Sequence, residues 1–386
     1  MSAASDPKPL GGRLVLDLSQ GIAGPYCGML LAEQGARVIK VEPPRGDWMR
    51  ALGAGVGGVS ASSLYYNRGK ESLLLDLKTP RALAAALSLA ARADVLIESA
   101  RPGAMAKLGL GFEAVRALNP GVVYLSISGY GLSGPKASWP LSDTYAQAFS
   151  GLMSINRADD GAPRKLQTPV IDAVTGLYAV QAAMAALWPA PGGAPRPARH
   201  LDISLIQAAA ALQAPKIMEA ALSDGRAAPA LNAPAGIYRA ADGWMAITLV
   251  TEPHWAALRG ALGLDALAGD PRFADFAARA ANLDTLRDKV AARLATRAVA
   301  DWTAELTALG IMAGPVNDHA AWLADPQVRA TEAAPETGIM GAAPPVARTP
   351  GRAAFAAPPP GLGADTARLA REFHLDIDID IDMEGP

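Results

Sequence analysis

The chain has 386 residues, of which 51% are hydrophobic and 19% charged, enough apolar side chains for two folded units. Its 35 lysine and arginine residues face 37 aspartate and glutamate residues, and the net charge of −2 gives no global attraction for nucleic acid or membranes. A single cysteine excludes an intrachain disulfide, no apolar signal core precedes Gly12, and no window approaches about 20 apolar residues. We therefore expect a soluble cytoplasmic protein that binds neither nucleic acid nor membranes.

The first third of the chain predicts repeated strand–helix units. Residues 13–18 and 37–41 are apolar runs typical of buried strands, and residues 26–34 have helical spacing that ends at Gly35. This order predicts a βαβ unit with parallel strands. The alternation continues with strands at 73–77, 94–97 and 122–126 and helices at 80–92 and 112–118. Together these segments predict a doubly wound, Rossmann-like α/β domain.

The second half of the chain changes in character. Residues 175–187 and 203–214 predict apolar helices, and residues 236–250 alternate as a hairpin around Asp242-Gly243. Amphipathic helices follow at 254–262, 283–296 and 300–309. This change predicts a smaller α+β domain at about 225–325. The terminal DIDIDIDMEGP is interpreted as a solvated tail.

Several common kinds of active site are absent from the sequence. The four histidines are scattered without zinc-ligand spacing, so we expect no metal site. The chain has neither a G-x-S-x-G elbow nor a G-x-x-x-x-G-K-[ST] loop, which disfavours serine hydrolases and P-loop NTPases. The run GAGVGG at 53–58 is interpreted as a flexible loop, because no strand precedes it.

Two aspartates stand at predicted helix starts. Asp172, in TPVIDAVTGL, joins an extended run to a long apolar helix, and Asp143 follows Ser142 before a helical pattern. Aspartate is a favoured N-cap residue, so capping is the default interpretation of each. The amides of a helix N-terminus also stabilise an oxyanion beside a reactive carboxylate. The local sequence leaves both interpretations open.

Basic residues lie near the ends of predicted strands. Lys70 is in NRGKES, and Arg101 and Lys107 are in ESARPGAMAKLGLG. They are either solvated surface charges or ligands for a phosphorylated molecule at the carboxyl edge of a parallel sheet. The residues alone favour neither.

Taken in order, these segments resemble the family III CoA-transferases, which include formyl-CoA transferase, carnitine CoA-transferase and α-methylacyl-CoA racemase. The resemblance covers roughly residues 11–330. It is carried by VLDLSQGIAGPYCGMLLAEQGARVIKVEPPRGD, NRGKESLLLDLKTP, DVLIESARPGAMAKLGLGFEAVRALNPGVVYLSISGYGLSGP, DTYAQAFSGLM, TPVIDAVTGLYAVQAAMAALW, HLDISLIQAAAAL, GIYRAADGWMAI, PRFADFAARAANLDTL and IMAGPVND.

The resemblance implies a role for each candidate residue. Asp172 takes the position of the family's catalytic aspartate, which is acylated during the reaction, and Asp143 that of an assisting acidic residue. The positions that contact CoA in the family fall on Lys70, Ser99, Arg101 and Lys107, where basic side chains suit phosphates. Acyl-CoA and a small carboxylic acid are the implied substrates, and no cofactor is tightly bound.

The resemblance also implies an architecture. Residues 1–224 begin a large CoA-binding domain, residues 225–325 form the small domain, and residues 326–386 return to the large domain and end in the tail. By the same resemblance, two chains are expected to interlock as a homodimer. The chain departs from the family at 230–236, which read ALNAPAG where some members have a glycine-rich lid, and at Pro43, where others have an arginine.

Two alternatives remain. The racemase branch needs a base on each face of the α-carbon and places a histidine before the position of Asp143. Here that residue is Ser142, which has no pKa near neutrality; Glu252 does match the racemase branch, whereas His254 is too remote to substitute. The other alternative is a CoA-binding dimer without catalysis. The sequence favours a transferase.

Overall fold

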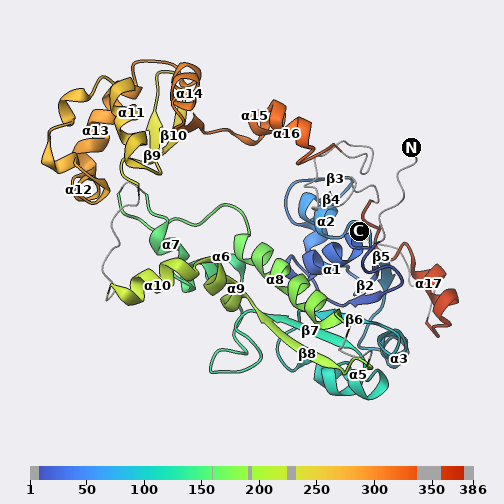
Figure 1. The fold of residues 1–386 in the computed structure, drawn as a ribbon. Coiled ribbons are helices and arrows are strands. Elements are labelled where there is room, and N and C mark those ends of the chain that lie inside the picture. The colour runs from blue at the N-terminus through green and yellow to red at the C-terminus, as the bar shows by residue number, and fades with distance from the viewer. Residues whose placement is uncertain (1–7, 159, 190–193, 224–231, 337–357, 378–386) are drawn as a thin grey trace. The chain divides into compact units, whose positions relative to one another are not determined.

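The computed structural model describes residues 8–158, 160–189, 194–223, 232–336 and 358–377 (Figure 1). The chain divides into two compact units, one formed by Met1–Ala214 with Glu332–Pro386 and the other by Pro215–Thr331. The unit boundaries therefore fall at 214/215 and 331/332, whereas the sequence predicted domain boundaries at 224/225 and 325/326. Residues 224–231, which include the start of the ALNAPAG segment, and residues 378–386, most of the acidic tail, lie outside the described residues.

The first unit contains a six-stranded parallel sheet in the order β5-β2-β1-β6-β7-β8. The strands are β1 Leu14–Asp17, β2 Arg37–Glu42, β5 Glu71–Leu74, β6 Val95–Glu98, β7 Val123–Ser128 and β8 Arg199–Ser204. Numbered along the chain, the strands of this sheet follow the doubly wound order, with the reversal between β1 and β6. The predicted α/β class is confirmed.

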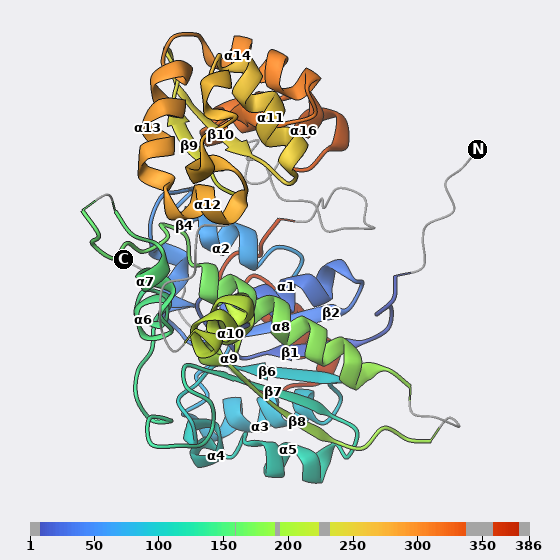
Figure 2. The ribbon, with the colours of Figure 1, turned by 60° about the vertical axis from the view of Figure 1, so that its left-hand side comes forward.

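Helices cover both faces of this sheet (Figures 1 and 2). Because successive strand residues point to opposite faces, Val15 packs with α1 (Ala23–Glu33) and α8 (Val170–Leu187), whereas Leu16 belongs to the core on the other face. That second layer holds α3 Pro80–Ala90, α5 Phe112–Leu118 and α17 Thr366–Phe373.

Helix α8 lies close against α1. A Cβ atom on Gly176 would stand 2.8 Å from Cδ1 of Tyr26 and 2.9 Å from the carbonyl oxygen of Ala23, so only glycine fits there. Of the helices in the described part of the chain, α8 alone is long and apolar enough to cross a membrane by length and composition, although no such window was expected from the sequence. Its buried face contributes to the core beneath the sheet.

Two local predictions were wrong. Residues 199–204, partly assigned to a helix, form the edge strand β8, and helix α9 (Leu205–Leu212) begins only after Ser204, which makes a capping box with Gln207. The GAGVGG run enters a short hairpin of β3 (Gly55–Val56) and β4 (Val59–Ser60) instead of a flexible loop.

The second unit is a three-stranded antiparallel sheet with helices. Strands β9 (Gly236–Arg239) and β10 (Trp244–Thr248) form the predicted hairpin, and β11 (Met312–Pro315), which was not predicted, pairs with β10. The helices in its core are α11 Glu252–Ala261, α13 Leu283–Leu294 and α14 Val299–Ala308. Among the described residues, the other α-helices are α2 Ala61–Tyr66, α4 Ala104–Leu108, α6 Asp143–Phe149, α7 Leu152–Ile155, α10 Ala214–Leu222, α12 Phe276–Ala281, α15 His319–Ala324 and α16 Pro326–Thr331.

Candidate active site

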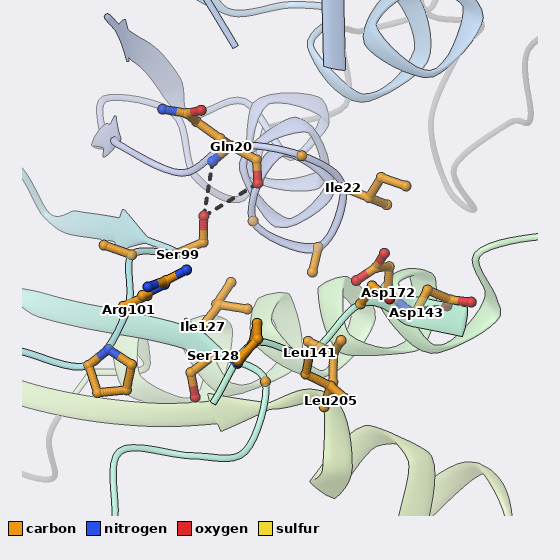
Figure 3. Close-up of a pocket in the computed structure, with 18 of the residues that line it drawn as sticks. Gln20, Ile22, Ser99, Arg101, Ile127, Ser128, Leu141, Asp143, Asp172 and Leu205 are labelled. Atoms are coloured by element: carbon orange, nitrogen blue, oxygen red, sulfur yellow. Dashed lines mark hydrogen bonds between the residues drawn. The ribbon is translucent and has the colours of Figure 1, made fainter. Parts of the chain in front are cut away.

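A pocket of about 530 Å³ opens at the carboxyl edge of the parallel sheet (Figure 3). It is lined by the loops that follow β1 and β6 and by residues at the starts of α6 and α8. Strands β1 and β6 are the neighbours between which the strand order reverses, and in open α/β sheets this point is where ligands bind. The topology therefore predicts a ligand site in this pocket.

Four of the six residues predicted for catalysis or CoA binding line this pocket. Figure 3 shows Ser99 and Arg101 on one side of it and Asp143 and Asp172 on the other. The structure thus brings together residues that lie far apart in the sequence, from Ser99 to Asp172. Lys70 and Lys107 are not among the lining residues.

Asp172 does not cap its helix. Helix α8 begins at Val170 after Pro169, so Asp172 is the third residue of the first turn and not the residue before the helix. Within the described residues, no hydrogen bond reaches its carboxylate, which is partly buried and lines the pocket. The capping interpretation of Asp172 is therefore wrong, and its carboxylate is available to a ligand.

The cap of α8 comes instead from Asp143. One carboxylate oxygen, Oδ2, accepts hydrogen bonds from the backbone N–H groups of Ile171 (2.7 Å) and Asp172 (3.1 Å). These are second- and third-position amides, the groups that an N-cap side chain normally satisfies. Asp143 is the first residue of α6, so one helix caps another and places the two carboxyl groups side by side.

This arrangement raises the pKa of Asp172 to about 7. Burial is the larger cause, because it disfavours the charged form, and the neighbouring negative charge of Asp143 adds to it. A carboxyl group that titrates near neutrality in a cleft is a candidate for a reactive group.

The loop after β1 forms the wall of the pocket next to Ser99. The hydroxyl of Ser99 accepts a hydrogen bond from the amide of Gln20 (3.0 Å) and donates one to its carbonyl (3.3 Å), as Figure 3 shows. Gly21 is in the left-handed region, and a Cβ atom there would lie 2.8 Å from Cζ2 of Trp48. The loop is thus fitted against both Ser99 and Trp48.

Buried ion pairs hold this loop from beneath. Asp47 accepts hydrogen bonds from the amide of Gly21 (3.1 and 3.2 Å) and lies 2.9 Å from the Nζ atom of Lys40. The same ammonium donates to the carbonyl of Ser19 (2.8 Å). Both side chains of this ion pair are fully buried. A buried ion pair therefore holds the loop that forms this wall of the pocket.

Lys70 belongs to this buried network and not to the pocket. Its ammonium donates to Asp17 Oδ2 (2.8 Å), the carbonyl of Pro25 (2.8 Å) and Asn67 Oδ1 (3.0 Å), so its three N–H donors all have partners. Burial lowers the pKa of Lys70, although Asp17 opposes that shift. The sequence assigned Lys70 to CoA; its contacts instead indicate a structural role.

We expect Lys70→Met to reduce the free energy of unfolding by about 3–5 kcal/mol, because the buried Asp17 would lose its ion-pair partner. Chemical denaturation of the variant beside wild type measures this loss. The exposed Lys78→Met is the matched control and should change stability by less than about 0.5 kcal/mol. An equal effect of both substitutions would contradict the assignment.

The two remaining cations differ in position. Arg101 is exposed and lines the pocket, and within the described residues its guanidinium forms no ion pair. Lys107 is an exposed residue in the last turn of α4. Its ammonium also forms no ion pair among the described side chains.

Sequence reasoning missed several lining residues, among them Gln20, Trp48 and Trp139. The signal that could have found the first was the Gly21 turn directly after the first strand of a doubly wound sheet. Trp48 begins a single 3-10 turn and Trp139 lies in a loop, and neither segment has a recognisable sequence pattern. Within the ranges that the structure describes, no group of three or more His, Cys, Asp or Glu side chains could hold a metal ion.

Glu252 and His254 belong to the second unit. The carboxylate of Glu252 lies 2.9 Å from a guanidinium nitrogen of the buried Arg279 and accepts a hydrogen bond from the amide of Phe276 (3.0 Å). The Nδ1 atom of His254 accepts a hydrogen bond from the amide of Val250 (3.3 Å). Both residues have local structural partners.

The chain is similar to known proteins over almost its whole length. Residues 10–366 match the family described as CoA-transferase family III. The chain is 35% identical to succinate–glutarate CoA-transferase of Agrobacterium fabrum, with 95% of this chain and 96% of that protein covered. It is 34% identical to acetyl-CoA:oxalate CoA-transferase of Acetobacter aceti, with 83% and 84% covered.

A solved structure gives the same result. The crystal structure of a CaiB/BaiF family protein from Brucella suis superposes with a TM-score of 0.82 at 33% identity, and 95% of this chain and 99% of that chain are covered. The resemblance in the sequence, the doubly wound sheet and the switch-point pocket agree with these matches. The chain belongs to CoA-transferase family III.

Proposed function

We propose that this protein transfers CoA between an acyl-CoA and a carboxylic acid, with Asp172 as the residue that becomes acylated. The observation that carries this proposal is the state of Asp172. Its carboxylate lines the switch-point pocket, has no hydrogen-bond partner among the described residues, and has a pKa raised to about 7. Such a group is close to ionisation at neutral pH and is poorly solvated, which suits a nucleophile.

The reaction proceeds through displacements at carbonyl carbons. The Asp172 carboxylate attacks the thioester carbonyl of the acyl-CoA, the C–S bond breaks, and a mixed anhydride and the CoA thiolate result. The thiolate then attacks the aspartyl carbonyl, forming an aspartyl-CoA thioester and releasing the first acid as its carboxylate. An incoming carboxylate reverses both steps, which yields the new acyl-CoA and restores Asp172.

The pocket walls support this chemistry. Ile22, Leu141 and Leu205 are apolar lining residues, and Figure 3 shows Ile22 and Leu141 flanking Asp172. Water that reached the anhydride would hydrolyse it and waste the acyl group, so an apolar surround protects the intermediate. Asp143 keeps the first turn of α8 in place, and with it the position of Asp172.

Arg101 and Ser99 lie across the pocket from Asp172 and are the proposed contacts for CoA. We expect Arg101→Ala to raise the KM for acyl-CoA roughly 10-fold while kcat at saturation stays within about twofold, because a phosphate contact acts in ground and transition states alike. Lys107→Ala tests the second basic position in the same assay. A loss of kcat at unchanged KM would contradict a phosphate-binding role for either residue.

The acid substrate is proposed to be a small mono- or dicarboxylic acid, with succinyl-CoA or acetyl-CoA as donor. The relatives support this class, since one is named for succinate and glutarate and another for oxalate and acetyl-CoA. Assays with a panel of such acids and both donors would identify the pair.

We also propose that the protein functions as an interlocked homodimer. Large apolar side chains on α8 and directly after it are exposed in the single chain: Leu177 by 46%, Tyr178 by 42% and Trp188 by 78%. Exposed apolar groups of this size on one helix favour coverage by a partner. Light scattering after size-exclusion chromatography should give twice the mass of the chain.

One assay separates transferase from racemase and from a CoA-binding dimer without catalysis. The protein is incubated with acyl-CoA and a free acid in deuterated water, and the products are analysed by mass spectrometry. New acyl-CoA without deuterium at the α-carbon supports the proposal, which Ser142 in place of a second base also favours. Deuterium incorporation without CoA exchange would support a racemase, and neither change would leave a binding protein.

A further inference from the structure

We infer that Gln147 is a positioning residue for the acylation step, because it fixes the carboxylate that in turn fixes the first turn of α8. This inference rests on the proposed role of Asp172. Gln147 is buried, with 1% of its surface exposed, and it lies one helical turn after Asp143 in α6. It is not among the lining residues of the pocket, so it can act on the reaction only through other residues.

The side-chain amide of Gln147 holds the carboxylate oxygen of Asp143 that does not cap α8. Its Nε2 group donates a hydrogen bond of 2.6 Å to Asp143 Oδ1, while Asp143 Oδ2 receives the amides of Ile171 and Asp172. Each oxygen of the Asp143 carboxylate therefore has a different anchor. This leaves the carboxylate one orientation in which all of its hydrogen bonds are kept.

The same side chain also ties down the segment that leads into α8. Its Oε1 atom accepts a hydrogen bond from the amide of Leu166 (2.9 Å), and Nε2 also lies 3.3 Å from the carbonyl of Leu166 and 3.4 Å from that of Thr168. The donors and acceptors around the side chain fix which end is nitrogen. Gln147 thus joins α6, the entry segment and, through Asp143, the nucleophile's own backbone.

A comparison of glutamine with glutamate at position 147 tests the hydrogen bond to Asp143, because the two side chains differ in charge. A glutamate in this place would offer the same shape, but only its protonated form could donate to Asp143. Its ionised form would place a second negative charge against that carboxylate and repel it. The variant Gln147→Glu is therefore expected to keep the anchor at low pH and to lose it at high pH, whereas Gln147→Leu loses it at every pH.

The test measures kcat and the KM for acyl-CoA from pH 6 to pH 9 in the full-length protein. We expect Gln147→Leu to lower kcat roughly 10- to 100-fold at every pH with KM within about twofold, because small displacements of a reacting group cost rate and not binding. At pH 6 the kcat of Gln147→Glu should lie within about threefold of the wild-type kcat. By pH 9 the ratio of the variant kcat to the wild-type kcat should be at least about 10-fold lower than at pH 6.

Gln213→Leu is the matched control. Gln213 is also a buried glutamine, with 5% exposure, and bonds to the hydroxyl of Ser150 (3.1 Å) and the carbonyl of Ala209 (3.1 Å) without touching Asp143. Its removal should keep kcat within about twofold even where it lowers the melting temperature.

The outcomes are separable. Unchanged kcat in Gln147→Leu, an equal loss in Gln213→Leu, or a pH-independent effect of Gln147→Glu would each overturn the positioning role. If Gln147→Leu does not fold, the pH dependence of Gln147→Glu still decides. Absence of CoA exchange in the wild-type protein would instead overturn the proposed function itself.

Discussion

Asp172→Asn is expected to lower the kcat of CoA exchange by at least about 10³-fold while acyl-CoA still binds. An amide has nearly the same shape as the carboxylate but is not a nucleophile at neutral pH, so the substitution removes the chemical step and leaves the pocket intact. Chromatographic measurement of acyl-CoA exchange gives kcat, and calorimetric titration with CoA gives binding.

The control is Asp301→Asn. Asp301 occupies the same third position in the first turn of its helix, α14, but it is exposed and belongs to the second unit. It should retain full activity. A kcat of Asp172→Asn within about 10-fold of wild type would refute the assignment of Asp172 as the nucleophile. An equal loss of kcat in Asp301→Asn would show that replacing any aspartate in a first helical turn has this effect.

The same variant should be more stable than wild type at alkaline pH. The pKa of Asp172 is about 7 in the folded protein and near 3.9 in an unfolded chain, so ionisation costs folding free energy as pH rises from about 4 to about 7. Asparagine never ionises and escapes this cost. Allowing for partial exposure, we expect a gain of about 2 kcal/mol at pH 8 that shrinks below about 1 kcal/mol at pH 5. A less stable variant at pH 8 would contradict the origin of the shift.

The second large effect is expected from Asp143→Asn. The wild-type rate, kcat/KM, should rise with pH as Asp172 ionises, with an apparent pKa near 7. Removing the negative charge of Asp143 lowers the pKa of Asp172, so the rise should move to lower pH by about one unit. The asparagine oxygen can still accept the hydrogen bonds from Ile171 and Asp172, which keeps the cap.

This prediction is checked by the pH dependence of kcat/KM between pH 5 and pH 9 in both proteins. A rise that stays in place or moves to higher pH would contradict coupling between the two carboxyl groups. Because the substitution also leaves Gln147 without an anionic acceptor, some loss of kcat at the plateau is expected as well.

The sequence predicts the core of the large unit well, and physical reasons explain where it fails. The strand at 13–18 was recognisable because both of its faces are buried, which produces a continuous apolar run. The edge strand β8 was missed because exposed Arg199, His200 and Asp202 interrupt its apolar residues, and the helix of α9 follows at once. Strand β11 contains glycine and proline, which hide a strand pattern.

The site follows the same division. Asp172 could be singled out from the sequence, but its position within the helix could not be predicted. The reason is that Asp143, far earlier in the sequence, supplies the cap of α8. Periodicity carries no information on such a distant contact. Lys70 was expected to contact CoA because buried lysines are rare, and only the fold reveals its buried pairing with Asp17. The buried role of Gln147 is likewise a product of tertiary contacts.

The most direct test is mass spectrometry of the protein after incubation with acyl-CoA and rapid quenching. We expect an adduct of the acyl group or of CoA on the peptide that contains Asp172, and no adduct in Asp172→Asn. Efficient CoA exchange with no adduct on that peptide, or with an adduct on a different side chain, would contradict it.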